Sequence, residues 1–265
     1  MIDFYHSPGS SCCVKVRFLL NEKGIEYREH LIDLRRGDQL TPAFRTLNPK
    51  AEVPVLVHDG FVLPESTVIM EYIEDKFPEP PLRPASPETR ARMRLWTKWP
   101  DEGGHIAYSS LAFAVSHRHQ AHDPTPGWVE AQLTEKPDAI RQARQKQAID
   151  LGLDDPALAA TMRKMDKMIR DMQAALSDKE WLADDRFSLA DIALIPYVVR
   201  LDVMTLLEIW RDDCPRVFEW LQAVRRRRGY RPTYEILDRS RTHQLMRENG
   251  IAAFEKLRSL VQAAA

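Results

Sequence analysis

The chain has 265 residues, with 38 Lys and Arg against 39 Asp and Glu and a formal net charge of -1. This length can bury a large core in one or two domains, and the balanced charge gives no reason to expect nucleic acid or an anionic membrane as a partner. Three cysteines, two of them adjacent, exclude a disulfide framework and indicate a reducing compartment. Neither a secretory signal nor an apolar run of roughly 20 residues is visible, so we expect a cytoplasmic, soluble protein.

The first 78 residues predict a small α/β unit. Residues 2–5 are typical of a strand, 11–23 of a helix that ends at Gly24, and 26–33 of a second strand. Because a helix connects these strands, they should pair in parallel. Asp59-Gly60 between two apolar runs predicts a hairpin, and a helix follows from Glu65 to about Phe77. The order β-α-β-(α)-β-β-α is that of a thioredoxin-like domain.

A proline-rich connector, 78–87, separates this unit from a region in which we predict only helices. We therefore expect an α/β domain over 1–78 and an all-α domain over 88–265. The predicted helices are 88–122, bent at Gly103-Gly104, then 139–149, 156–176, 192–207 and 214–229, followed by a helical tail over 231–263, with a loop over 123–138. Ser188 and Asp191 have the spacing of a capping box before the buried helix 192–207. We interpret the methionine stripe of 156–176 as core, and the arginine run 225–228 as cations at a helix carboxyl end.

Serines and cysteines gather where the first strand gives way to the first helix. Ser10, Ser11, Cys12 and Cys13 occupy this position. The unpaired N–H groups and the dipole of a helix start stabilise an anion such as a thiolate, although serines here also serve as ordinary caps. The thiolate could belong to one of the cysteines or to a ligand whose sulfur accepts a hydrogen bond from a serine.

Two further segments fit a peptide ligand. Val53-Pro54 opens a strand, and because proline cannot join the ladder, the backbone of Val53 could pair with an extended peptide instead. Glu65-Ser66 begins a helix, where free N–H groups suit a carboxylate and Glu65 suits an ammonium. A turn and a helix cap are the plain alternatives. One ligand, glutathione, has a thiol, a peptide backbone and an α-amino-acid end that would occupy all three places.

The chain resembles a cytosolic glutathione transferase along nearly its whole length. The segments that carry the resemblance are Ser7-Pro8-Gly9-Ser10-Ser11-Cys12, Asn48-Pro49 with Val53-Pro54, Glu65-Ser66, and Ser188-Leu189-Ala190-Asp191. The resemblance implies a thioredoxin-like domain followed by a helical bundle, a homodimer, and glutathione as co-substrate. It makes Ser10 the thiol-activating hydroxyl, with Ser11 and Cys12 as further candidates.

The same resemblance suggests the rest of the glutathione site. It places Gln39 at the glycyl end. Ala51 stands where related enzymes have a histidine, so Lys50 is expected to make the glycyl contact instead. Val53 and Pro54 are expected at the peptide backbone of glutathione, and Glu65 and Ser66 at its γ-glutamyl end. The second substrate, a hydrophobic and aromatic electrophile, is expected in the helical domain near Trp99, His105, Tyr108 and Phe113. No metal site is expected.

A narrower resemblance concerns the beta-etherase transferases of lignin-degrading bacteria. It is carried by Met93-Arg94-Leu95-Trp96-Thr97-Lys98-Trp99 with Asp101-Glu102, and by the long segment 120–155. It implies that glutathione thiolate displaces an aryloxide from an α-keto aryl ether. General conjugation, dehalogenation and isomerisation are alternatives within the family. Two alternatives lie outside transferase activity. One is a thiol–disulfide reductase that acts through Cys12 or Cys13, and the other is a non-catalytic ligand-binding protein.

Overall fold

A computed structural model describes residues 1–120, 139–238 and 241–263. Its four strands are β1 (Ile2–His6), β2 (Arg28–Leu31), β3 (Val55–His58) and β4 (Phe61–Pro64). They form one mixed sheet of order β2-β1-β3-β4, in which β1 pairs in parallel with β2 and antiparallel with β3. The predicted parallel pair and the hairpin are thus confirmed. The second strand is shorter than predicted, because it is a largely exposed edge strand.

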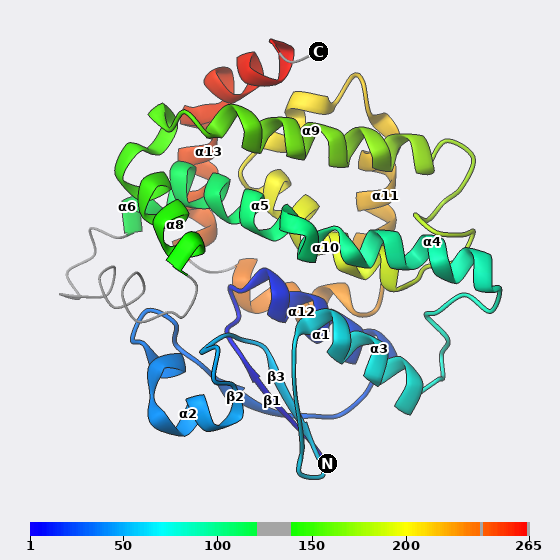
Figure 1. The fold of residues 1–265 in the computed structure, drawn as a ribbon. Coiled ribbons are helices and arrows are strands. Elements are labelled where there is room, and N and C mark those ends of the chain that lie inside the picture. Colours follow the sequence, from blue (N-terminus) through cyan, green and yellow to red (C-terminus); the bar gives the residue numbers. More distant parts are fainter. Residues whose placement is uncertain (121–138, 239–240, 264–265) are drawn as a thin grey trace.

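Helix α1 (Ser11–Lys23) lies between the sheet and the helices of the second half of the chain (Figure 1). It packs against α3 (Ser66–Lys76) and against two helices of the second half of the chain, α10 (Leu189–Val203) and α12 (Tyr230–Asp238). Because both faces are covered, its apolar residues are buried all round rather than along one stripe. The helix ends at Gly24, whose φ of 68° is left-handed, as predicted. The short α2 (Pro42–Leu47) stands at the side of β2.

All described residues after β4 are helical or irregular, which confirms the predicted fold class of a thioredoxin-like unit followed by helices. The helices are α4 (Pro87–Lys98), α5 (His105–Ala112), α6 (Arg118–Gln120), α8 (Ala139–Leu151), α9 (Leu158–Ala175), α10 (Leu189–Val203), α11 (Pro215–Arg225), α12 (Tyr230–Asp238) and α13 (Arg241–Gln262). None of the described helices combines the length and apolarity needed to cross a bilayer. The domain limits 1–78 and 88–265 stay a prediction.

The long helix predicted over 88–122 is interrupted at Pro100–Gly104, which includes the predicted bend, since Glu102 and Gly103 leave helical geometry. From His105 the backbone stays helical through a wider π-helical stretch at Phe113–His117 to Gln120. Pro100 has no N–H to donate and Gly103 has a left-handed φ of 88°, so the helix cannot continue straight. The helical tail predicted over 231–263 is present as α12 and α13, and residues 239–240 between them lie outside the described residues. The loop predicted over 123–138 lies outside the described residues.

Helix α10 forms the centre of the helical part, and its predicted capping box is present. Ser188 Oγ accepts a hydrogen bond from Ala190 N–H, and Asp191 Oδ2 accepts one from Ser188 N–H at 3.0 Å. The methionine stripe of α9 is core, as predicted, since its members at 162, 165, 168 and 172 are fully buried.

The arginines at 225–228 were expected to interact with a helix carboxyl end, but two of them form ion pairs with carboxylates. Arg225 pairs with Asp202 at 2.6 Å and Arg227 pairs with Glu22 of α1. Carboxylates, rather than the helix end alone, therefore hold these cations.

Candidate active site

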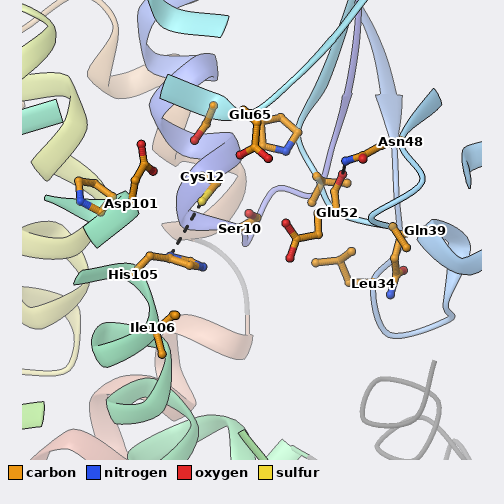
Figure 2. Close-up of a pocket in the computed structure, with 15 residues that line it drawn as sticks. Ser10, Cys12, Leu34, Gln39, Asn48, Glu52, Glu65, Asp101, His105 and Ile106 are labelled. Carbon is orange, nitrogen blue, oxygen red and sulfur yellow. Dashed lines mark hydrogen bonds between the residues drawn. The ribbon is translucent and has the colours of Figure 1, made fainter. Parts of the chain in front are cut away.

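A cavity of about 230 Å³ lies between the thioredoxin-like unit and the helices (Figure 2). Its lining from the first unit consists of Ser10, Cys12, Leu34, Gln39, Asn48, Ala51, Glu52, Val53, Pro54, Glu65 and Ser66. The helical part contributes Pro100, Asp101, His105 and Ile106. The structure therefore brings seven of the predicted site residues to one place, although they come from separate segments of the chain.

Ser10 lies at the start of α1 and lines the cavity. Its Oγ accepts a hydrogen bond from Cys13 N–H at a long 3.4 Å, so the hydroxyl proton remains available to a ligand atom in the cavity. The free N–H groups of the first turn lie behind it, with their positive dipole end. This arrangement can hold an anionic sulfur.

The neighbouring residues of this loop differ sharply in access to the cavity. Ser11 is buried and does not line it. Cys13 is fully buried, and burial raises the pKa of its thiol to about 12, so the thiol stays protonated and unreactive at neutral pH. Cys12 does line the cavity. Burial therefore disfavours Cys13 as a reactive thiol, and Ser11 is not among the residues that line this cavity.

Asn48 shapes the loop that leads to Val53. Its amide donates to Glu52 O at 2.8 Å and its Oδ1 accepts from Lys50 N–H at 3.1 Å. The peptide bond between Val53 and Pro54 is cis. Val53 lies two residues before β3, so its backbone stands outside the sheet ladder, and the residue lines the cavity.

Gln39 contributes a buried amide to the same cavity. Its side chain is fully buried, and neither Nε2 nor Oε1 has a hydrogen-bond partner in the described part of the chain. Leaving a buried amide unpaired costs about 1–3 kcal/mol per group, so such an amide beside a cavity points to a polar ligand group.

The start of α3 lines the cavity with Glu65 and Ser66. Glu65 has a left-handed φ of 73° and provides no side-chain cap, so the N–H groups that follow Ser66 are left for a ligand. A non-glycine residue in this region is strained by about 1–3 kcal/mol, and such strain gathers at ligand sites. Lys50 does not line the cavity; its Nζ pairs with Glu65 Oε1 at 2.7 Å instead.

His105 brings a titratable group from the helical part to the serine loop. Its Nδ1 lies 3.9 Å from Cys12 Sγ and 3.3 Å from the hydroxyl of Tyr197, a residue of α10 (Figure 2). Of the residues expected around the second substrate, His105 alone lines this cavity. Phe113 lines a different one, while Trp99 and Tyr108 pack against Tyr197.

The sequence did not single out Leu34, Glu52, Pro100 or Ile106 as site residues. Pro100 was the available signal, since a proline inside a predicted helix indicates a break at which side chains can turn towards a cavity.

Models of two domains match the chain. The glutathione S-transferase N-terminal domain matches residues 9–76 and the C-terminal domain matches 155–223. Protein LigF of Sphingobium sp. strain SYK-6 is 30% identical over 245 residues, which cover 91% of this chain and 94% of LigF. The chain belongs to the glutathione S-transferase family.

Solved structures agree with this membership. The crystal structure of beta-etherase LigF matches with a TM-score of 0.79 and 30% identity, covering 89% of this chain and 99% of that one. Glutathione transferase F7 of Populus trichocarpa shares the fold, with a TM-score of 0.69 at 23% identity over 89% of this chain and 98% of its own. The protein is thus a glutathione transferase with glutathione as its co-substrate. This membership favours transferase activity over the reductase and the non-catalytic alternatives.

Proposed function

We propose that this glutathione transferase cleaves β-aryl ethers. The observation that carries the proposal is the similarity to LigF, a beta-etherase, over 91% of the chain. In the proposed reaction the glutathione sulfur attacks the carbon that bears the aryloxide. A carbon–sulfur bond forms, the carbon–oxygen bond breaks, and the aryloxide leaves with the electron pair. The thiol gives up its proton and the aryloxide takes one up, so the products are a thioether and a phenol.

The proposed glutathione position follows the cavity from one end to the other. Ser10 donates its hydroxyl hydrogen to the thiolate, the Val53 backbone pairs with the peptide, and the start of α3 receives the γ-glutamyl carboxylate. Gln39 meets the glycyl end with its unpaired amide. Lys50 was expected at the glycyl end; its pairing with Glu65 supports a role in orienting that carboxylate towards the ligand ammonium.

The second substrate is proposed to approach the sulfur from the helical side. Pro100 and Ile106 offer apolar surface for an aromatic group, and His105 is the titratable group that faces Cys12 across the cavity. An imidazole at this place can give a proton to the departing aryloxide.

Release of a phenol tests the reaction directly. The purified protein, incubated with glutathione and a β-aryl ether ketone, is expected to produce one phenol for each glutathione consumed. The same incubation without glutathione, or with S-methylglutathione, is the control and should release none. Turnover of a general electrophile such as 1-chloro-2,4-dinitrobenzene without any phenol from the ether would refute ether cleavage while leaving the transferase activity intact.

A homodimer and a cytoplasmic location complete the proposal. The family resemblance supports the dimer, and the absence of a disulfide among the described cysteines at 12, 13 and 214 supports a reducing compartment. Sedimentation equilibrium is expected to give twice the chain mass of 30.6 kDa. A single species at the chain mass over the micromolar range would contradict the dimer.

A further inference from the structure

A second cavity, of about 410 Å³, lies on the other side of the turn that leads to Ser10. Residues 7–9 of that turn line it, and Leu34 lines both cavities. Further apolar surface comes from Phe113, Leu237 and Met246. The cavity is large enough for a two-ring aromatic molecule, and the glutathione cavity accounts for none of its helical-side residues.

A buried cation borders this cavity. Arg200 of α10 is only 5% exposed, and a charged side chain is seldom buried to this degree unless it is paired. One nitrogen of its guanidinium, Nη2, donates to the carbonyl of Gly9. Its Nε has no hydrogen-bond partner, and no carboxylate in the described part of the chain forms an ion pair with it. The fold has therefore buried a positive charge beside a cavity and left it without a counter-ion.

Two other buried cations of the described chain are better satisfied. Lys23 pairs with Glu74 at 2.8 Å and also donates to two carbonyls. Arg17 donates to the carbonyls of Pro8 and Thr233 and contacts His6. Lys15 is also fully buried and its Nζ has no hydrogen-bond partner among the described residues, but it lines neither of the two cavities. An uncompensated buried charge costs several kcal/mol, and of these four cations Arg200 is the one that both lacks a counter-ion and lines a cavity.

The other charged groups that line the cavity do not neutralise Arg200. Asp33 accepts hydrogen bonds from the backbone N–H groups of Arg35 and Arg36 with its Oδ1, which holds its carboxylate in its own turn. Burial and the nearby charge of Arg200 lower the pKa of His243 to about 4, so His243 is neutral at pH 7. His117 and Arg35 add no negative charge.

We propose that this cavity binds an aromatic carboxylate, with Arg200 as its counter-ion, and that this carboxylate is part of the second substrate. A carboxylate would accept from the unpaired Nε–H, and the aromatic body would lie against Phe113, Leu237 and Met246. Binding of the carboxylate stands on the cavity alone, whereas its identity as part of the second substrate rests on the proposed function.

Two ligands of the same shape test the binding. With 2-naphthoate and neutral 2-naphthylmethanol as probes, calorimetry on the wild-type protein is expected to show about tenfold tighter binding of the carboxylate, the gain of one charge-assisted hydrogen bond. Arg200→Gln removes the positive charge while keeping a polar side chain, and should reduce this preference to about parity. The matched exchange Arg211→Gln, at an exposed arginine paired with Glu208, should leave it unchanged.

The outcomes that overturn the inference are equal affinities of the two probes for the wild-type protein, or a preference that survives Arg200→Gln. If Arg200→Gln does not fold, nuclear magnetic resonance on the wild-type protein decides. The Arg200 Nε–H signal should shift with 2-naphthoate and not with 2-naphthylmethanol, and an unmoved signal overturns the proposal.

The carboxylate site and the ether reaction fail separately. Naphthoate binding through Arg200 without phenol release would refute ether cleavage and leave the site standing. Phenol release without any preference for the carboxylate probe would refute the carboxylate site and leave ether cleavage standing. For the link between the two, an aryl ether ketone that carries a ring carboxylate should have a several-fold lower KM than its methyl ester in the wild-type protein, and equal KM values would break that link.

Discussion

Replacing Ser10 by alanine is expected to lower the transferase rate at pH 7 by about ten- to a hundredfold. The hydroxyl lies at the start of α1 with its proton free for a ligand atom in the cavity. A hydrogen bond to a charged group contributes about 1.5–3 kcal/mol, which corresponds to about one to two pKa units of the bound thiol. Without it, a smaller fraction of bound glutathione is thiolate, and less of it can attack.

The pKa of bound glutathione is the decisive measurement. Ultraviolet titration of the thiolate in the complex should give a pKa about one to two units higher in Ser10→Ala than in the wild-type protein, and the rate at high pH should recover. Glu65→Gln provides the contrast, because it weakens the contact with the amino-acid end. It should raise the KM for glutathione and leave the thiol pKa unchanged.

Substitution of Cys12 separates the two candidate groups for the sulfur. Cys12 lines the same cavity and lies 3.9 Å from His105 Nδ1, so it is the rival to Ser10. If Cys12→Ala abolished turnover while Ser10→Ala left the rate and the thiol pKa unchanged, the serine assignment would be wrong. Ser11→Ala serves as a control, since Ser11 is buried away from the cavity.

The parts of this fold that the sequence predicts well are those governed by neighbouring residues. Gly24 ends α1 because glycine accepts the left-handed conformation, and Asp59-Gly60 makes the hairpin for the same reason, with φ values of 50° and 87°. Ser188 and Asp191 satisfy each other across one helical turn. Each of these signals acts over four residues or fewer, so no knowledge of tertiary contacts was needed.

The contacts between the thioredoxin-like unit and the helices are harder to predict from the sequence. His105 reaches Cys12 only because the helix breaks at Pro100 and α5 packs beside α10, where Tyr197 holds the imidazole. Arg200 belongs to a largely apolar run that predicts a buried helix, and nothing in the run shows that the guanidinium lines a cavity. Contacts between residues about a hundred positions apart are set by packing, which local patterns do not determine.

Replacing Asp191 by alanine is expected to destabilise the protein by about 3–5 kcal/mol. Its fully buried carboxylate accepts hydrogen bonds from Leu182 N–H at 3.0 Å, Ser188 N–H at 3.0 Å and Trp220 Nε1–H at 2.8 Å. Alanine leaves these three buried donors unpaired at about 1–3 kcal/mol each, partly offset by relaxation. Ser188→Ala is the milder comparison: it removes the cap contact with Ala190 N–H and the hydroxyl bond to Asp191 Oδ2, and the loss of a cap costs about 1 kcal/mol. Urea denaturation of the three proteins measures the differences.

The pH dependence of this effect identifies its source. Burial raises the pKa of Asp191 to about 6, against the lowering effect of its hydrogen bonds. The folded state therefore holds a proton that the unfolded state, with a pKa near 3.8, has released. The contribution of Asp191 to stability grows as the pH falls through 6 and is lost as the pH rises. The gap between wild type and Asp191→Ala should be about 1 kcal/mol larger at pH 5 than at pH 7. A gap that shrank at pH 5 would show that the hydrogen bonds, not burial, control this carboxyl.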